Sequence, residues 1–253
     1  RVTLEEVAAL PGVDRQARGP QAPILLGVEE SRLGPLVMWP RTEPFMYLFG
    51  DSKSGKTTFL RSVAREIARL CTPREAQIFV VDVRRTLLGE IPEEYLAGYL
   101  TTREDAQAHF NDLVKFFKRR IPGDQVTTEQ LRHRSWWTGP EVWVLVDDYD
   151  LVATSSGTNP LLPLQPLMAQ ARDIGLHILV VRRMGGASQA SFEPVLKTMG
   201  ELGATGILLS GSPDEGTIIG RVRPVRSAPG RAQVVSRDLG LVMAQLAWTP
   251  PQS

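Results

Sequence analysis

An apolar run leads directly into a glycine-rich turn in the segment Phe45-Met-Tyr-Leu-Phe-Gly50-Asp-Ser-Lys-Ser-Gly55-Lys-Thr-Thr58. The apolar run predicts a buried strand, and the apolar spacing from Thr57 to Leu70 predicts a helix that begins where the turn ends. The pattern Gly-x-x-x-x-Gly-Lys-Thr between a strand and a helix is typical of a phosphate-binding P-loop, and this context disfavours a chance match. We therefore expect the chain to bind a nucleoside triphosphate.

The spacing of the turn has a physical reason. Gly50 lets the chain leave the strand tightly, and Gly55 lets the backbone approach an oxyanion closely. The N–H groups of the turn and of the helix N-terminus then form an anion site. We expect Lys56 to reach the β- and γ-phosphates of ATP, and the Thr57 hydroxyl to ligate Mg²⁺. The predicted nucleotide-binding residues are Gly50, Asp51, Ser52, Lys53, Ser54, Gly55, Lys56, Thr57 and Thr58.

The composition is that of an ordinary globular protein, 42% hydrophobic and 23% charged. The 29 basic and 28 acidic side chains nearly cancel, so no overall field attracts nucleic acid. The single cysteine, Cys71, cannot form an internal disulfide, which fits a reducing cytosol, and we expect it to be a small buried apolar residue. No apolar run reaches the roughly 18 residues that a membrane span needs. Since the chain starts at Arg1 without an initiator methionine, we expect a piece of a longer protein.

The N-terminal part of the chain predicts three features before the P-loop. Residues 1–23 begin with a short helical pattern, and Pro11 to Pro23 predicts a linker or a strap over the core. Two short apolar runs, 24–28 and 36–39, predict a hairpin packed near the P-loop strand.

After the P-loop, strand and helix patterns alternate. Fully apolar runs predict buried parallel strands at 77–82, 142–146, 176–181 and 206–209. Helical patterns occupy 102–120 (capped by Thr102 and Asp105), 160–172 and 193–199. The alternating runs 231–235 and 241–246 predict a hairpin at the sheet edge. The chain thus predicts one domain, 1–253, with an α/β fold of the RecA-like P-loop NTPase class: a mostly parallel central sheet flanked by helices, with an antiparallel edge hairpin.

Acidic residues end the strand that lies about 90 residues after the P-loop, in Val142-Trp-Val-Leu-Val-Asp147-Asp148. Asp147 is the predicted partner of Thr57 in the Mg²⁺ shell, while capping of the next turn is the less favoured alternative. Asp148 is a candidate to position the attacking water. An aspartate reaches less far than a glutamate, so structural and catalytic roles for Asp148 stay equally open.

Other charged residues near the strand ends are weaker candidates. Asp82 ends a neighbouring strand and either supports the Mg²⁺ shell or pairs with Arg84 or Arg85. Arg182 is a candidate sensor of the γ-phosphate, but an ion pair with one of the acids at 147–150 is favoured for it and its neighbour. The arginines at 221, 223, 226, 231 and 237 predict a solvated basic segment. The three histidines lack metal-ligand spacing.

With these motifs together, the chain resembles the FtsK/SpoIIIE class of P-loop motors, and more closely an ATPase domain of EccC from mycobacterial type VII (ESX) secretion systems. Three segments carry most of this resemblance: Gly50-Asp-Ser-Lys-Ser-Gly-Lys-Thr-Thr58, Val80-Val-Asp-Val-Arg-Arg-Thr-Leu-Leu88 and Val144-Leu-Val-Asp-Asp-Tyr-Asp-Leu-Val152. The segments Gly175-Leu-His-Ile-Leu-Val-Val-Arg-Arg183, Leu208-Leu-Ser-Gly-Ser-Pro-Asp-Glu-Gly216 and Pro229-Gly-Arg-Ala232 extend it.

The resemblance implies a cytoplasmic ATPase domain that works at the inner face of the cell membrane through the rest of a secretion complex. Other ATPase domains and small helical-hairpin secreted substrates, held by a C-terminal signal, are its implied partners, and no specific nucleic acid is expected. DNA-pumping members usually carry Glu at the position of Asp148 and Thr-Gln at that of Val181-Arg182. These departures predict slow hydrolysis of ATP. The alternatives are a DNA translocase domain and a nucleotide-locked structural module.

Apolar and aromatic residues in irregular segments are candidates to line a groove for a substrate helix. They are Trp136, Trp137, Leu161 and Leu162. For each of them alone, a place in the domain's own core is the favoured interpretation, so the groove is predicted without assigned residues.

Overall fold

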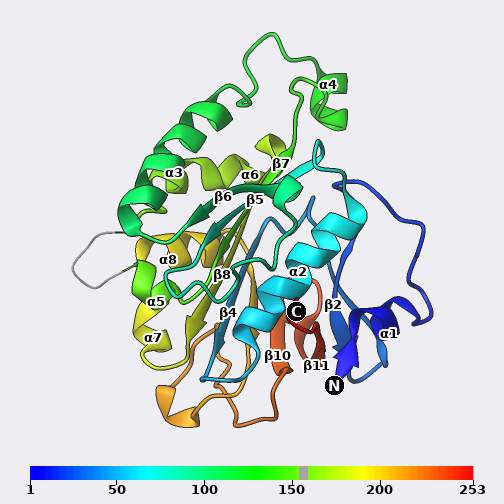
Figure 1. The fold of residues 1–253 in the computed structure, drawn as a ribbon, viewed down its shortest axis with the longest axis vertical. Helices are drawn as coiled ribbons and strands as arrows, with labels where there is room; N and C mark the ends of the chain where they lie inside the picture. Colours follow the sequence, from blue (N-terminus) through cyan, green and yellow to red (C-terminus); the bar gives the residue numbers. More distant parts are fainter. Residues whose placement is uncertain (154–158, 253) are drawn as a thin grey trace.

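The computed structural model describes residues 1–153 and 159–252 (Figure 1). Its strands are β1 (Val2–Thr3), β2 (Ile24–Glu29), β3 (Gly34–Met38), β4 (Phe45–Gly50), β5 (Ala76–Val81), β6 (Leu96–Leu100), β7 (Glu141–Val146), β8 (Leu176–Arg183), β9 (Thr205–Leu208), β10 (Arg231–Ser236) and β11 (Gly240–Trp248). Its α-helices are α1 (Leu4–Ala8), α2 (Lys56–Leu70), α3 (Arg103–Lys118), α4 (Thr128–His133), α5 (Tyr149–Val152), α6 (Ala171–Ile174), α7 (Ala187–Ala190) and α8 (Pro194–Glu201). The 3₁₀ segments are η1 (Glu93–Tyr95), η2 (Leu162–Gln170) and η3 (Pro213–Glu215).

Across the described ranges the strands form one sheet in the order β3-β2-β11-β10-β9-β4-β8-β7-β5-β6, with β1 beside β11. The six strands from β9 to β6 run parallel to one another. The strands β10, β11, β2 and β3 continue the sheet in antiparallel pairs. The predicted α/β fold with a mostly parallel central sheet is therefore confirmed.

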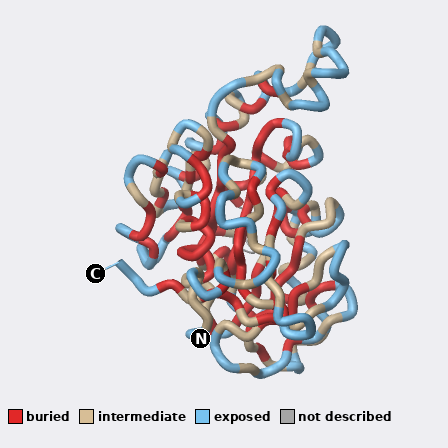
Figure 2. Tube along the Cα trace, turned by 90° about the vertical axis from the view of Figure 1, so that its right-hand side faces the viewer, coloured by how far each residue is buried: buried red, intermediate tan, exposed pale blue. Residues whose placement is uncertain are grey.

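Helices cover both faces of the central strands and create two cores. Helix α2 packs on one face, and α3, η2, α6 and α8 pack on the other. Alternate residues of β7 serve the two cores: Trp143 and Leu145 face α2, while Val144 and Val146 face α3 and η2. Because both faces are covered, every residue of β7 is buried, and the strand is an uninterrupted apolar run in the sequence. Figure 2 shows buried segments running through the middle of the molecule.

Both predicted hairpins form, but their places in the sheet differ from the prediction. Strands β10 and β11 pair antiparallel, yet they lie inside the sheet between β9 and β2, so the edge position predicted for residues 231–246 is wrong. Alternation of polar and apolar residues shows only that one face is less buried; it does not locate a strand along the sheet. The antiparallel edge hairpin is β2–β3 instead, and three strands separate it from β4, so it does not pack beside the P-loop strand.

Two other segments depart from the sequence-based expectation. The segment 160–172 is mostly the 3₁₀ segment η2 followed by the single turn α6, not one α-helix. Pro166 lacks the N–H group that an α-helix starting at residue 160 needs at this position. Strand β6 at the parallel edge of the sheet was not predicted.

Other predictions agree with the structure. Helix α3 begins at Arg103 with Thr102 as N-cap, and the Thr102 hydroxyl accepts a hydrogen bond from the Asp105 N–H. Residues 9–23 contain neither helix nor strand and cross to the end of α2, where the Gly19 N–H donates to the Leu70 carbonyl at 2.7 Å. Within the described part of the chain, no helix is long and apolar enough to span a membrane.

Candidate functional site

The glycine-rich turn connects β4 to α2 at the carboxyl end of the parallel strands. Gly50 ends β4, and a Cβ atom there would clash with Ser54 Oγ and lie 2.9 Å from Leu209 Cβ. Gly55 is the N-cap residue of α2 and has a φ of 117°, which favours glycine. The two glycines of the pattern are therefore required by the shape of the turn itself.

The turn is held by its own atoms and by two distant segments. Lys56 Nζ and Ser54 Oγ donate to the Asp51 carbonyl at 2.9 and 2.8 Å. The Asp51 N–H donates to Ser210 O, and the Gly230 N–H donates to Ser54 O, both at 2.8 Å. The predicted residues Gly50, Asp51, Ser52, Lys53, Ser54, Gly55, Lys56, Thr57 and Thr58 thus form one continuous loop and the first residues of α2.

The helix that follows supplies the anion site expected of such a turn. The first N–H groups of an α-helix have no intrahelical partner, and α2 starts at a glycine, which has no side chain to cap it. A partial positive charge and free donors at this position suit a phosphate group. The residues present therefore fit a nucleotide phosphate.

Thr57 and Asp147 meet although they lie 90 residues apart. The Thr57 hydroxyl donates to Asp147 Oδ2 at 2.7 Å, and the Thr86 hydroxyl donates to the same oxygen at 2.9 Å. Asp147 is 1% exposed, and burial raises the pKa of its carboxyl above the ordinary value. A hydroxyl and a carboxylate are hard oxygen donors of the kind that Mg²⁺ prefers, usually with several waters. The residues present fit Mg²⁺, and the proximity of Thr86 was not predicted from the sequence.

Asp82 is connected to Asp147 through Thr86, whose hydroxyl donates to Asp147 and lies 3.4 Å from both Asp82 carboxylate oxygens, so its support of the Mg²⁺ shell stays a prediction. Its carboxylate accepts hydrogen bonds from the Leu87 N–H at 2.7 Å and from the Tyr99 hydroxyl at 2.6 Å. Its ion pair with Arg84 or Arg85 does not form in the described structure, where Arg84 pairs with Asp148 instead. Asp82 therefore holds the loop that follows β5. Burial, together with the bond to Asp82, raises the pKa of the Tyr99 hydroxyl.

The carboxylate and the backbone N–H of Asp148 each make a contact that fixes their position. Its Oδ2 lies 3.1 Å from Arg84 Nε, and its N–H donates to Asp147 Oδ1 at 2.9 Å. Its φ of 43° places it in the left-handed region, which non-glycine residues rarely adopt. An aspartate in this conformation beside the Mg²⁺ candidate is a feature that often accompanies a functional site.

Arg182 and Arg183, at the end of β8, contact different groups. Arg183 pairs with Asp150 at 3.1 Å, which is the ion pair favoured for this position from the sequence. Arg182 lies beside Phe49 in the register of β4 and β8, and its Nη1 donates to the carbonyls of Arg183 and Gly185, both at 2.9 Å. Burial lowers the pKa of Arg182. The structure therefore places Arg182 one strand away from the turn without a contact to Thr57 or Asp147.

Several contacts of the turn could not be read from sequence patterns. Ser210 follows β9, and Gly230 lies in the Pro-Gly-Arg segment that precedes β10. At Gly230, the only sequence pattern is the Pro229-Gly230 pair, which predicts a turn but not its contact with Ser54. Ser210 reaches the turn because β9 is the direct neighbour of β4, and Gly230 lies close by because β10 pairs with β9.

The four groove candidates mostly complete the domain's own packing. Leu161 is fully buried, and Leu162 packs against the same core. The indole N–H groups of Trp136 and Trp137 donate to the carbonyls of Arg120 and Asp173 at 2.7 and 2.8 Å. A groove for a helix is therefore not formed by these residues as a group.

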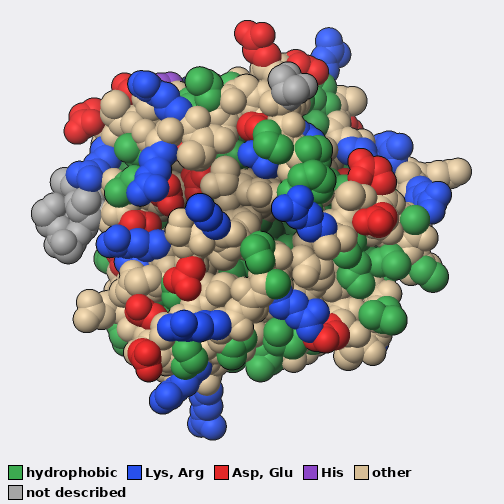
Figure 3. All heavy atoms as spheres, turned by 60° about the horizontal axis from the view of Figure 1, so that its bottom comes forward, with side chains coloured by type: hydrophobic (Ala, Val, Ile, Leu, Met, Phe, Trp, Pro, Cys, Tyr) green, Lys and Arg blue, Asp and Glu red, His purple; other side chains and the backbone are tan. Residues whose placement is uncertain are grey.

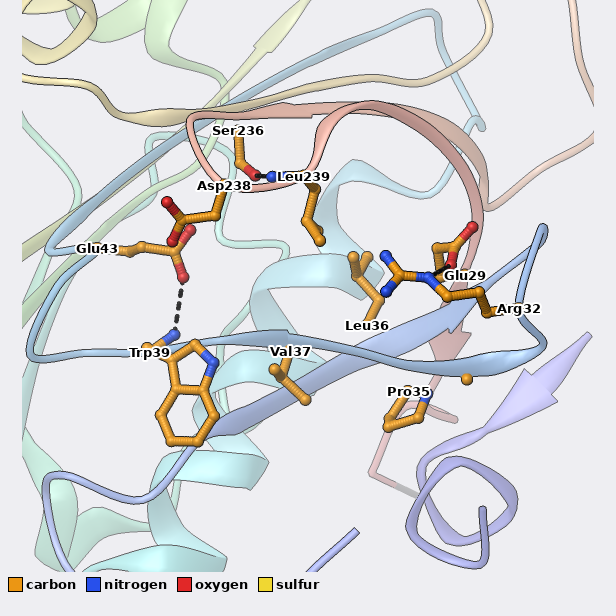
Figure 4. Close-up of a pocket in the computed structure, with 11 residues that line it drawn as sticks. Glu29, Arg32, Pro35, Leu36, Val37, Trp39, Glu43, Ser236, Asp238 and Leu239 are labelled. Atoms are coloured by element: carbon orange, nitrogen blue, oxygen red, sulfur yellow. Dashed lines mark hydrogen bonds and ion pairs between the residues drawn. The ribbon is translucent and has the colours of Figure 1, made fainter. Parts of the chain in front are cut away.

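Two cavities elsewhere have exposed apolar side chains. One, of about 330 Å³, lies between the edge strand β3 and the β10–β11 turn and includes Trp39, which is 50% exposed, and Leu239 (Figure 4). Glu43 borders it and accepts a hydrogen bond from the Trp39 N–H. The other, of about 170 Å³, lies between β4 and α8 and includes Phe192, which is 77% exposed. Phe192 also lines an adjoining cavity of about 710 Å³, which includes Arg182 and Gln189.

The known proteins that this chain resembles in sequence are secretion system proteins. No protein-family model matches the chain. The ESX-4 secretion system protein EccC4 of Mycobacterium tuberculosis is 43% identical over 99% of this chain, and the ESX secretion system protein EccC of Thermomonospora curvata is 38% identical over 97%. The chain spans only 20% and 19% of the lengths of these two relatives.

Solved structures agree with the sequence relatives. The cytoplasmic domain of the T. curvata type VII secretion ATPase EccC superposes with a TM-score of 0.88 at 37% identity, over 96% of this chain and 28% of that one. ATPases 2 and 3 of the same protein, solved in complex with a signal sequence peptide, give a TM-score of 0.86 over 95% and 43% of the two chains. EssC, at 17% identity and a TM-score of 0.71, shares the fold. The homologues of this chain are therefore ATPase domains of EccC proteins from ESX secretion systems, and its fold is that of their FtsK/SpoIIIE-type P-loop ATPases.

Proposed function

We propose that the chain is an Mg·ATP-binding ATPase domain of a type VII secretion motor, which couples nucleotide binding to substrate recruitment or export. The observation that carries the proposal is the meeting of Thr57 and Asp147 beside a P-loop whose glycines are sterically required. The similarity to EccC proteins supports the secretion context. The chain covers a fifth of those proteins, so the assembly as a whole enters only through this proposal.

Each residue of the turn has a role in the proposed binding. Bound Mg²⁺ would neutralise charge on the β- and γ-phosphates. Lys56 contributes a mobile ammonium to the phosphates, and the N–H groups at the start of α2 orient them. Thr57 and Asp147 would provide oxygen ligands to the metal, and a hydrogen bond of 2.7 Å joins them. Thr86 donates to the same Asp147 oxygen and keeps it in place.

Hydrolysis by this site is proposed to be slow. Asp148 would have to position the attacking water, yet its carboxylate is paired with Arg84. Arg182, the candidate sensor of the γ-phosphate, donates to the nearby carbonyls of Arg183 and Gly185. An arginine finger supplied by a partner can be worth about 10³–10⁵ in rate. Neighbouring ATPase domains, in the same or a partner chain, are the proposed source of such a group.

The proposed specific partners are helical-hairpin secreted proteins that present a C-terminal signal, with the domain on the cytoplasmic side of a membrane secretion complex. A signal sequence peptide is bound in the T. curvata structure that resembles this chain. The face in Figure 3, which brings the bottom of Figure 1 forward, mixes Lys and Arg with Asp and Glu side chains. A DNA motor needs a basic channel, and the near balance of 29 basic and 28 acidic side chains favours the secretion proposal over the DNA translocase.

A titration with two ligands tests the proposal. Fluorescently labelled signal peptide and duplex DNA are each titrated into the domain at low and high salt. Docking of an apolar helix face should tolerate salt, whereas binding to six to ten phosphates weakens by about 10³–10⁵ between 50 and 200 mM salt. Salt-dependent DNA binding without peptide binding would replace the secretion motor with a translocase.

The two cavities with exposed apolar side chains are the proposed places for the peptide helix. Trp39→Ala removes the aromatic side chain of the cavity beside β3, and Phe192→Ala does the same beside α8. Each substitution is at an exposed position, so the fold should tolerate it, and the variant that loses peptide affinity shows whether the peptide contacts Trp39 or Phe192. If neither variant changes the affinity, the helix binds elsewhere on the domain.

A further inference from the structure

A separate cavity of about 240 Å³ lies at the opposite end of the sheet from the P-loop. Arg41 precedes β4, Arg74 and Glu75 precede β5, and Trp137 precedes β7, so these residues gather at the amino ends of the strands. The P-loop leaves β4 at its carboxyl end, and the six residues of β4 span about 20 Å. Helix α4, near the top of Figure 1, borders this end of the molecule.

Arg134 is the central charge of the cavity. It follows α4 in the left-handed conformation, and its side chain is 9% exposed. Its Nη1 donates to Glu141 Oε1 at 2.9 Å, and its Nε donates to the Asp173 carbonyl at 3.5 Å. Its Nη2 is buried and has no hydrogen-bond partner among residues 1–153 and 159–252. Because a buried guanidinium donor without a partner is costly, this atom calls for an acceptor.

The acids that line the cavity do not supply that acceptor. Glu141 already accepts from Arg134, Gln21 and His177. Glu75 accepts from the N–H and the hydroxyl of Thr72 at 2.8 and 2.9 Å. Both carboxylates are therefore engaged inside the domain.

The other arginines of the cavity have spare donors. Arg41 makes one hydrogen bond, from its Nη2 to the Arg132 carbonyl at 2.9 Å. Arg74 is exposed and donates to no side chain or carbonyl in the described part of the chain. Three arginines against two glutamates leave one net positive charge in the lining. A single negative charge neutralises it.

We propose that this cavity binds a carboxylate, presented as an aspartate or glutamate side chain by a protein partner. The planar guanidinium fork matches a carboxylate in two parallel hydrogen bonds. A dianionic phosphate would exceed the net charge of the lining and repel Glu75 and Glu141. The guanidinium groups of Arg120 and Arg134 lie over the Trp137 ring, at 3.8 and 5.2 Å from its centre. The part of Trp137 that stays exposed in the wall gives an apolar contact for the hydrocarbon stem of a side chain. The site goes beyond the proposed nucleotide and signal-peptide functions and uses none of their residues.

The test is an NMR titration of the ¹⁵N-labelled domain, followed at the Trp137 indole and the Gly139 amide. The probes are a polyglutamate peptide blocked at both ends, acetate and inorganic phosphate, at constant ionic strength. The expected result is saturable binding of the peptide, competed weakly by acetate and more weakly by phosphate. Tighter binding of phosphate would make the cavity a phosphoryl site, and acetate binding as tight as the peptide would remove the protein partner. Either result, or no saturable shift, overturns the proposal.

Charge-reversal variants show whether the peptide binds in this cavity or is only attracted by the overall charge of the domain. Arg74→Glu should weaken the peptide by about tenfold or more, because a charge-assisted contact is worth about 1.5–3 kcal/mol and 1.4 kcal/mol corresponds to a factor of ten. Arg223→Glu makes the same charge change at an exposed position outside the cavity and should leave the peptide affinity unchanged. Equal effects of the two variants would overturn the proposal.

A third variant addresses the Nη2 donor of Arg134. Arg134→Lys keeps the charge but removes this donor, so it should weaken peptide binding; if it unfolds by circular dichroism, Arg41→Glu replaces it. Affinity for Mg·ATP is measured for every variant and should not change, because the P-loop is about 20 Å away. Loss of the peptide with intact ATP binding therefore distinguishes this proposal from the nucleotide function.

Discussion

Replacing Lys56 by alanine should separate nucleotide binding from folding. In the described structure, the Lys56 ammonium makes one hydrogen bond, to the Asp51 carbonyl at 2.9 Å, in an exposed position. An exposed bond of this kind contributes about 1 kcal/mol or less to stability. Since 1 kcal/mol shifts the melting temperature of a protein of this size by about 2–4 °C, Lys56→Ala should melt within a few degrees of the wild type.

The loss in binding should be far larger. Lys56 is expected to contact two phosphates, and hydrogen bonds to charged groups are worth about 1.5–3 kcal/mol each. Two such contacts amount to about 3 kcal/mol or more, which corresponds to a loss of about a hundredfold or more in affinity. Isothermal titration calorimetry with Mg·ATP measures the affinity, and differential scanning calorimetry measures the melting temperature.

Lys53→Ala is the matched control. Lys53 lies three residues earlier in the same turn, is exposed, and donates no hydrogen bond to a described residue. Alanine keeps the Cβ atom, so the strain of the left-handed backbone at residue 53, with a φ of 62°, stays the same. If both variants lose affinity equally, the effect comes from the net charge of the turn. Unchanged affinity in Lys56→Ala would refute the P-loop assignment altogether.

Three further outcomes follow from the site and the core. Turnover by the isolated domain should lie far below about 10 per second, a median enzyme value, and Asp148→Glu should raise it or leave it unchanged; a marked decrease would contradict the argument from reach. Burial raises the pKa of Cys71 to about 12, so a thiol reagent should label it only as fast as the domain unfolds, and rapid labelling of the folded domain would contradict this. Burial opposes ionisation of Glu141, but its bonds with His177 and Arg134 outweigh burial and lower its pKa. Its stabilising contribution is therefore present above its ordinary pKa and lost as pH falls through the lowered value. Glu141→Gln should cost about 3–5 kcal/mol at neutral pH, and chemical denaturation should show that difference narrowing in acid.

The strands of the central sheet could be predicted closely because burial on both faces leaves a direct mark in the sequence. The predicted runs 77–82, 142–146 and 176–181 differ from β5, β7 and β8 by one or two residues at the ends. Strand β6 lacks such a mark, since it is an edge strand with a glycine and only one fully buried residue. A run that is only partly apolar does not distinguish a strand from a loop.

The order of strands was less accessible because it depends on pairing between distant segments. The β10–β11 hairpin alternates polar and apolar residues, as an edge hairpin would, yet it joins the parallel and antiparallel halves of the sheet. Gln233 illustrates the reason: it is buried between β9 and β11 although its side chain is polar. A local pattern reports burial of a face and contains no information on the neighbouring strands.

In the candidate site too, contacts that follow from local sequence patterns could be predicted, and contacts that depend on the order of the strands could not. The pairing of Thr57 with Asp147 could be predicted, because any P-loop strand and its acid-ended partner bring these side chains to one edge of a parallel sheet. The partner of Asp148 could not be predicted, because Arg84 reaches it only if β5 and β7 are neighbours. The same adjacency brings Thr86 to Asp147.

These contacts give the loop after β5 a single structural role. Asp82 fixes the loop at its start by accepting hydrogen bonds from the Leu87 N–H and the Tyr99 hydroxyl. The loop so fixed delivers Thr86 to the carboxylate proposed for Mg²⁺ and Arg84 to the carboxylate proposed for the attacking water. The pair with Arg84 is the weaker of the two, because Arg84 is 61% exposed whereas Thr86 bonds to a buried oxygen. A partner that draws Arg84 away would therefore free Asp148 without disturbing Thr86 or Asp147, so the proposed positioning of the attacking water and the proposed Mg²⁺ site depend on different contacts of one loop.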